Sequence, residues 1–204
     1  MSGQGLVPPP AGIDACCLFD LLASGNTEAI LRASEFSWQL PSAVRGEVQY
    51  ARRHDPAQPG KLVKVPADLT GLIASGPLTE CDPKNPQELD RFTHCATLFR
   101  SDGESMCLAL AEQRGWVVAT DDRRAIRVAR QAGLTVVSCP QLLKAWADAT
   151  APDQATLLRV LCGTLRYSPS SSRTRPCPST SAGSISLPRR AREPSFFPQV
   201  TPPP

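Results

Sequence analysis

The chain is poor in aromatic residues and contains no long apolar run. Aromatic residues make up only 5% of its 204 residues, so a buried core has to be built from Leu, Val, Ala and Ile within an apolar share of 41%. No apolar segment reaches the roughly 18 residues that a membrane-spanning helix needs. The first ten residues also lack the basic segment followed by an apolar one that a secretory signal shows. We therefore expect a cytoplasmic protein with no membrane partner.

Cysteine pairs with metal-ligand spacing are absent as well. Cys16 and Cys17 are adjacent, the other cysteines are scattered, and no Cys-x-x-Cys pair occurs. Since His54 and His94 lie near no such pair, this spacing argues against a zinc site and favours buried, reduced thiols. A Cys–His nucleophile formed by His94 and its neighbour Cys95 stays open.

The net charge of +3 is unevenly distributed along the chain. Residues 168–204 contain five arginines and one glutamate, a balance of +4, which leaves −1 for residues 1–167. The same segment holds nine prolines and nine serines, a composition that cannot bury enough apolar surface to offset the entropy of ordering. We expect a folded domain over 1–167 and a disordered tail over 168–204. The tail is either a basic arm that contacts a nucleic-acid backbone or an inert extension.

The first 167 residues alternate between strand-like and helix-like segments. The expected strands cover 11–14, 36–40, 61–65, 78–81, 116–119 and 134–137. The expected helices cover 16–23, 27–33, 42–53, 66–74, 86–99, 103–114, 123–132, 140–149 and 153–165. Thr27 and Ser42 are expected as N-caps. This alternation predicts an α/β fold with a mainly parallel central sheet flanked by helices, whose functional crevice lies at the carboxyl ends of the strands.

Acidic residues occupy the positions that face such a crevice. Asp14 ends the first expected strand, and Asp121 and Asp122 follow a later one, where Thr120 could orient a carboxylate or a metal-bound water through its hydroxyl. Glu104 lies in the first turn of a helix whose following run, 106–111, carries no charge, and there a carboxylate also serves simply as a cap. Grouped carboxylates repel one another unless cations hold them. The pattern therefore favours metal-dependent chemistry on a phosphate substrate.

Glu47 is the fifth acidic candidate. It lies three residues after Val44 and four before Ala51, so a helix over 42–53 would place it on the inward-facing side. Taken alone, each of these acids is as well explained by a solvated or ion-paired side chain. Only their combination indicates a shared acidic pocket.

The order Ile13-Asp14, then Glu47 on a helix, then Asp102-Gly103-Glu104, then Thr120-Asp121-Asp122 resembles that of the PIN-domain nucleases. It is particularly similar to the VapC-type toxin ribonucleases, over residues 11 to about 165. The resemblance implies a PIN-like three-layer fold and an endoribonuclease that cleaves RNA phosphodiesters by metal-activated water. It also implies a protein antitoxin as partner, with a homodimer as one arrangement.

The resemblance further implies roles for the individual acids. Those expected to act in catalysis are Asp14, Glu47, Glu104, Asp121 and Asp122, and those expected to hold Mg²⁺ or Mn²⁺ are Asp14, Glu104, Asp121 and Asp122. Because adjacent residues at a strand end point to opposite sides, only one of Asp121 and Asp122 is expected to be a direct ligand. Glu104 stands where many family members have aspartate.

Three arginines are candidates for binding the RNA backbone, namely Arg45, Arg123 and Arg124. The alternative for them is an ordinary solvated helix face. A second hypothesis for the chain is a catalytically inactive PIN-like module that binds RNA or protein. A third is another acid-rich phosphotransfer domain, such as a response-regulator receiver or a haloacid-dehalogenase-type phosphatase. It is disfavoured because Asp14 is followed by Ala15-Cys16-Cys17 and not by a second aspartate two residues on.

Overall fold

The computed structural model of the protein describes residues 7–54, 58 and 61–165. The expected disordered tail at 168–204 lies outside the described residues. None of the described helices is both long enough and apolar enough to cross a membrane.

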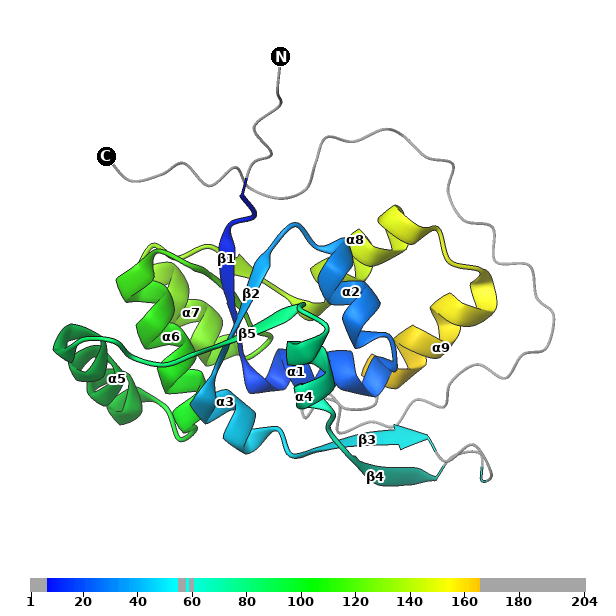
Figure 1. Ribbon diagram of the computed structural model, residues 1–204, viewed down its shortest axis with the longest axis horizontal. Helices are drawn as coiled ribbons and strands as arrows, with labels where there is room; N and C mark the ends of the chain where they lie inside the picture. Colours follow the sequence, from blue (N-terminus) through cyan, green and yellow to red (C-terminus); the bar gives the residue numbers. More distant parts are fainter. Residues whose placement is uncertain (1–6, 55–57, 59–60, 166–204) are drawn as a thin grey trace, which may run out of the picture.

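A five-stranded parallel sheet forms the centre of the molecule (Figure 1). Its strands are β1 (Pro10–Ile13), β2 (Ser37–Pro41), β5 (Leu78–Cys81), β6 (Val117–Ala119) and β7 (Val136–Val137). They are arranged in the order β5-β2-β1-β6-β7, and every neighbouring pair is parallel. The predicted α/β fold with a mainly parallel sheet is confirmed.

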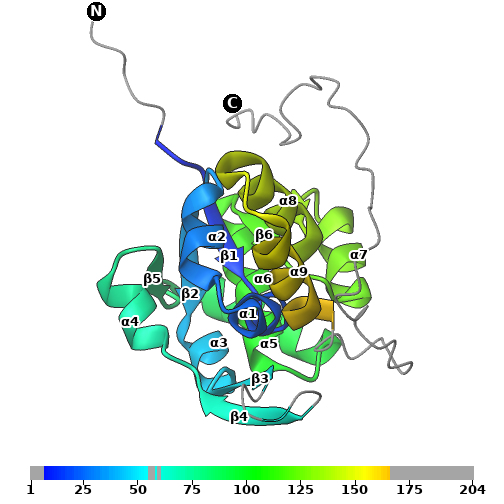
Figure 2. The ribbon, with the colours of Figure 1, turned by 90° about the vertical axis from the view of Figure 1, so that its right-hand side faces the viewer.

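Helices cover both faces of this sheet. One layer holds α1 (Ala15–Ser24), α2 (Thr27–Ala33), α8 (Cys139–Thr150) and α9 (Gln154–Leu165), and Figure 2 looks onto it with the sheet behind. The opposite layer holds α5 (Pro86–Leu98), α6 (Asp102–Arg114) and α7 (Arg123–Gln131) (Figure 1). A sheet covered on both faces has to bury both sets of side chains. This accounts for the strand β6, in which all three residues are buried.

The core contains mainly aliphatic residues, as the low aromatic content predicts. One of its largest side chains is Trp38 on β2, whose indole N–H donates to the carbonyl of Leu31 (3.1 Å) and to Oγ of Ser34 (2.8 Å). The segment Gly103–Ala111 of α6 is buried apart from Glu104. The apolar helix expected from the sequence therefore packs against the sheet between α5 and α7.

The structure corrects two local predictions. The helix expected over 42–53 is wrong, because α3 (Ser42–Glu47) ends at Glu47 and the next segment forms the strand β3 (Tyr50–His54). This strand pairs antiparallel with β4 (Leu62–Pro66) in a separate hairpin, and that pairing overrides the local preference for helix. The predicted caps are each one residue off, since Asn26 and Pro41 hold the N-cap positions of α2 and α3. Between the hairpin and β5 lies α4 (Leu69–Ala74).

The winding direction of the sheet reverses between β1 and β6. The chain progresses outward from β1 to β2 and β5, then returns to the other side of β1 and continues through β6 to β7. Ile13 and Ala119, the last residues of β1 and β6, are directly paired. In open parallel sheets, ligands bind outside the carboxyl ends of the strands at such a reversal. Asp14 and the segment 120–122 begin there.

Candidate functional site

Asp14 lies at the centre of the candidate site. It follows β1 and is the N-cap of α1, and its side chain is only 4% exposed. The carboxylate accepts hydrogen bonds from the backbone N–H of Ala15 (2.6 Å), from Sγ of Cys16 (3.0 Å) and from Oγ1 of Thr120 (2.9 Å). Thr120 is fully buried, and its hydroxyl donates to the Asp14 carboxylate. Burial raises the pKa of Asp14 even though these hydrogen bonds oppose the rise.

Glu104 approaches Asp14 from the first turn of α6. Its Oε1 atom is buried and finds no hydrogen-bond partner among the described residues. The pKa of Glu104 is raised to about 8, first by burial, then by the negative charge of Asp14 and of Asp122. The nearby carboxyl group of Asp122 therefore favours the protonated form of Glu104.

The neighbours Asp121 and Asp122 point in different directions, as expected at the end of a strand. Both carboxylate oxygens of Asp121 accept from the backbone N–H of Cys139, at 3.2 Å each, and therefore face α8. Asp122 is the N-cap of α7 and accepts from the backbone N–H groups of Arg124 (2.7 Å) and Ala125 (2.9 Å). The pKa of Asp121 is raised by burial and then by the charge of Asp14, so Asp14 interacts electrostatically with both Glu104 and Asp121.

Glu47 does not face inward, and this prediction is corrected. It is an exposed residue at the end of α3, because the helix that would have turned it inward stops there. Its carboxylate accepts from the backbone N–H of Gly103 (2.7 Å) and from Oγ of Ser101 (2.8 and 2.9 Å). Glu47 thus caps the N-terminus of α6 at the edge of the site, close enough for its charge to raise the pKa of Asp14 slightly.

Two residues of α1 belong to the site although the sequence did not single them out. Sγ of Cys16 lies between Asp14 and Thr120, 3.4 Å from Oγ1 of Thr120, and accepts from the backbone N–H of Asp121 at 3.5 Å. Asp20 has a buried Oδ1 atom without a partner among the described residues. Its pKa is raised to about 7 by burial and then by the charge of Asp121. The available signal was that Asp20 is the one charged residue in the apolar stretch 15–24.

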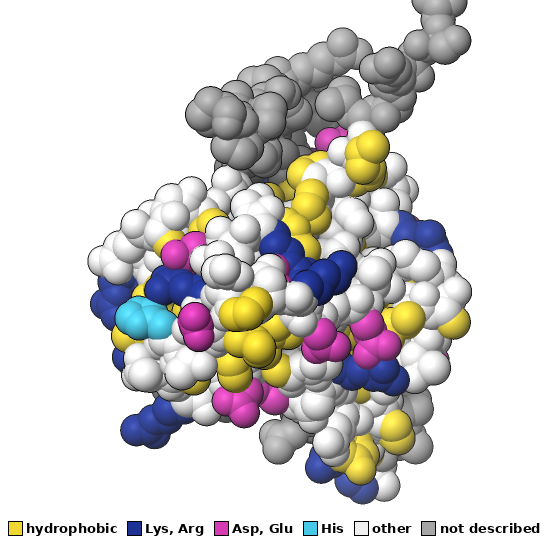
Figure 3. Space-filling view, turned by 60° about the vertical axis from the view of Figure 1, so that its left-hand side comes forward, with side chains coloured by type: hydrophobic (Ala, Val, Ile, Leu, Met, Phe, Trp, Pro, Cys, Tyr) yellow, Lys and Arg dark blue, Asp and Glu magenta, His cyan; other side chains and the backbone are white. Residues whose placement is uncertain are grey.

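The predicted RNA-binding arginines divide into two groups. Arg123 and Arg124 are exposed on the first turn of α7, and the guanidinium of Arg124 lies 5.5 Å from the centre of the Phe99 ring. The charge of Arg124 partly opposes the raised pKa of Glu104, so this arginine borders the acidic residues. Arg45, in contrast, forms an exposed ion pair with Glu80 of β5. On the side of the molecule where α5 lies, basic and acidic side chains are interspersed (Figure 3).

The open alternative of a Cys–His nucleophile does not fit α5. His94 is exposed and Cys95 is completely buried, so the imidazole faces solvent while the thiol faces the core.

A hard divalent cation fits the donor set of the acidic residues. Carboxylate oxygens are the ligands that Mg²⁺ and Mn²⁺ prefer, and the unpartnered Oε1 of Glu104 is an oxygen that a cation would satisfy. In the described part of the chain, the group whose possible ligand atoms all lie within 4.8 Å of one another is a different one, Cys17, Asp121 and Cys139. No protein-family model and no curated protein matches the sequence. A function has therefore to be inferred from the site itself.

Proposed function

We propose that the chain is a PIN-like endoribonuclease that requires Mg²⁺ or Mn²⁺ and acts as the toxin of a toxin–antitoxin pair. The proposal depends on one observation. Asp14, Glu104 and Asp121 come from three separate elements near the place where the sheet reverses its winding, and the charge of Asp14 raises the pKa of both Glu104 and Asp121. Such repulsion destabilises the site unless protons or cations neutralise it.

The residues that would hold the cation are Asp14, Glu104 and one of the pair Asp121 and Asp122. Of this pair, Asp122 lies close enough to Glu104 to raise its pKa, whereas Asp121 is held by the N–H of Cys139 and has to turn from it to join the others. When bound, the ion supplies a lowered pKa for a water molecule and charge neutralisation for the phosphate.

The other residues of the site position this chemistry. Thr120 and the N–H of Ala15 fix the orientation of the Asp14 carboxylate. Arg123 and Arg124 are exposed beside Asp122 and offer positive charge to the phosphates that flank a scissile bond. RNA would therefore approach along the first turn of α7, with the reacting phosphate toward Glu104.

A second candidate function is supported by a specific observation, namely that most of the acids already have a structural role. Asp14 caps α1, Glu47 caps α6, Asp122 caps α7, and Asp121 binds the first N–H of α8. A scaffold could keep these residues for helix capping alone. The chain would then be a catalytically inactive PIN-like module that binds RNA or protein.

The test is cleavage of a labelled single-stranded RNA by the full chain with Mn²⁺, before and after addition of a chelator. We expect metal-dependent cleavage that falls by about 100-fold or more in Asp14→Asn and in Glu104→Gln, since each variant loses a charge that holds the cation. Asp148→Asn, an exposed acid of α8 paired with Lys144, is the matched control and keeps full activity.

Circular dichroism verifies that each variant is folded. RNA binding without any metal-dependent cleavage by the folded wild-type chain would contradict the nuclease and support the inactive module. If Glu104→Gln cleaved RNA as fast as wild type, Glu104 and its acidic neighbours would not be the site of cleavage.

A further inference from the structure

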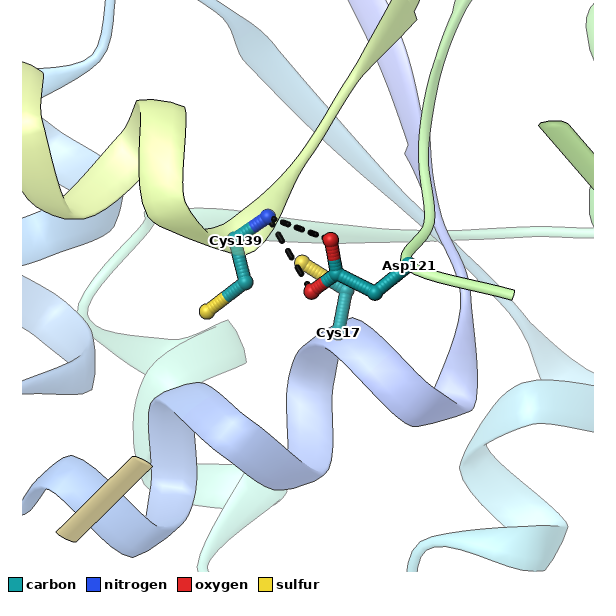
Figure 4. A group of neighbouring side chains, drawn as sticks. All are labelled: Cys17, Asp121 and Cys139. Carbon is teal, nitrogen blue, oxygen red and sulfur yellow. Dashed lines mark hydrogen bonds between the residues drawn. The ribbon is translucent and has the colours of Figure 1, made fainter. Parts of the chain in front are cut away.

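Beside the acidic residues lies a second group of possible metal ligands with different chemistry. Cys17 on α1, Asp121 after β6 and Cys139 at the start of α8 come together although they are far apart in the sequence (Figure 4). Their two Sγ atoms and a carboxylate oxygen all lie within 4.8 Å of one another. Cysteine spacing along the chain gave no sign of this group, because the contact between α1 and α8 is a tertiary one.

We propose that Cys17, Cys139 and Asp121 form a binding site for Zn²⁺ or a similar thiophilic divalent ion. Two sulfur atoms and one oxygen are a ligand set that suits zinc and excludes Mg²⁺, which takes oxygen ligands almost exclusively. Three protein ligands leave a fourth position of the tetrahedron open. The site shares Asp121 with the nuclease proposed above, but its two thiol ligands do not depend on that proposal.

The environment of the three residues favours an ion over an accidental contact. Both oxygens of Asp121 accept from the N–H of Cys139, an outer contact of the kind that fixes the orientation of a ligand carboxylate. Cys17 and Cys139 are buried at 0% and 2% exposure, whereas Asp121 is half-buried and provides access from solvent.

Asp20 gives an independent indication of a cation at this place. It lies three residues after Cys17 on α1, so the two side chains share a side of the helix. Its buried Oδ1 atom has no hydrogen-bond partner among the described residues, and it lies close enough to Asp121 for the two charges to repel. A divalent ion between the thiols and Asp121 would relieve this repulsion, and Asp20 is the candidate for its fourth ligand.

Metal binding releases the protons of the two thiols and changes no oxidation state. The hydrogen bond with the Cys139 side chain, and then burial, raise the pKa of the Cys17 thiol, so this thiol carries its proton before the ion arrives. The ion forms two metal–sulfur bonds and one metal–oxygen bond, two S–H bonds break, and two protons pass to solvent. Affinity therefore rises with pH.

Cobalt(II) titration of the full chain tests the site, because thiolate ligands give Co²⁺ a near-ultraviolet charge-transfer absorption that oxygen ligands alone do not give. We expect this absorption to saturate at one ion per chain and to disappear when Zn²⁺ displaces the cobalt. Cys17→Ala and Cys139→Ala should lose it together with about tenfold or more of the affinity. Cys95→Ala, which removes an equally buried thiol on α5, is the matched control and retains it.

X-ray absorption at the zinc edge of the wild-type chain gives a readout that needs no variant. Two sulfur atoms at about 2.3 Å from the zinc are expected. Zinc surrounded by nitrogen and oxygen only, or a folded wild-type chain that gives no cobalt–thiolate absorption, would overturn the proposal. So would a thiolate absorption that persists in a folded Cys17→Ala/Cys139→Ala double variant.

Discussion

A carboxyl group half-buried beside two other acids, as Glu104 is, keeps its proton to a higher pH than a solvated carboxyl group. The pKa of Glu104 rises from its ordinary value of 4.5 to about 8 in the folded chain. Between these pH values the folded state binds more protons than the unfolded state, so the free energy of unfolding falls as the pH rises. Asp20, whose pKa rises to about 7, adds to the same slope at lower pH.

We therefore predict that Glu104→Gln flattens the pH dependence of stability when divalent ions are absent. The glutamine has no proton to lose, so the variant gains stability relative to wild type as the pH rises from about 4.5 to about 8. Urea denaturation in a chelator at several pH values measures this difference. Asp148→Asn should keep the wild-type slope, and identical slopes for wild type and Glu104→Gln would contradict the assignment.

The residues of the site differ in how far the sequence reveals them. Asp14, Asp121 and Asp122 could be predicted because each follows a recognisable strand, and parallel strands end at the same edge of a sheet. Asp20 and Cys16 could not, because nothing local indicates which side of α1 faces the strand ends. The pairing of Cys17 with Cys139 depends on how α1 and α8 pack, and the spacing of cysteines along the chain does not reveal that packing.

At the scale of the elements, a residue of α3 caps the N-terminus of α6. The N-terminal N–H groups of a helix have no partner within it, and at α6 the carboxylate of Glu47 supplies one from the end of α3. Gly103 permits this contact, because a Cβ atom there would lie 3.0 Å from the Glu47 carboxylate. The short α3 thus fixes the beginning of the helix that carries Glu104.

We predict that Glu47→Ala lowers the free energy of unfolding by about 1 kcal/mol, which is typical for loss of a helix cap. The backbone N–H of Gly103 should exchange its hydrogen faster, because it loses its acceptor. Chemical denaturation and hydrogen exchange measure the two effects. Glu47→Gln keeps an acceptor oxygen and should lose less stability, whereas unchanged exchange at Gly103 in Glu47→Ala would show that the cap does not operate.

The length of α3 shows where prediction of elements from sequence fails. Residues 42–53 have an apolar spacing that suits a helix, but Tyr50–His54 pairs with Leu62–Pro66. The partner strand lies outside residues 42–53, so the hydrophobic period of that stretch alone cannot detect the pairing. Helices whose apolar stripe meets the core, such as α5, α6 and α7, were predicted to within one or two residues.

At the scale of the whole molecule, the last described helix, α9, packs against the first, α1. Gly163 of α9 lies against the backbone of α1, where a Cβ atom would come within 2.5 Å of the carbonyl oxygen of Ala23 and 3.0 Å of Cα of Ser24. Backbone atoms cannot move aside as a flexible side chain can. The close approach of α9 to α1 therefore depends on glycine at this position.

We predict that Gly163→Ala destabilises the fold by about 1 to 3 kcal/mol, in spite of the better helix propensity of alanine, because it overpacks the contact with α1. Gly46→Ala in α3 is the matched control, since nothing lies within 4 Å of its added Cβ, and it should be neutral or slightly stabilising. Thermal or urea denaturation distinguishes the two. A Gly163→Ala chain as stable as wild type would mean that the helices separate without cost.

The order of the strands could not be predicted, although their parallel arrangement could. Alternating strands and helices imply crossover connections, but they do not tell which strand lies beside β1. That choice brings Ile13 next to Ala119 and so determines that the acids meet at all.

The pairing of β1 with β6 also determines when the acidic residues can come together during synthesis of the chain. During translation the amino-terminal half emerges from the ribosome while the partner strand at 117–119 is still being synthesised. The long intervening stretch must then be looped out and closed before the two strands dock, a slow and entropically costly event. The negatively charged centre is consequently assembled late, and a truncated nascent polypeptide carries Asp14 without its counterparts.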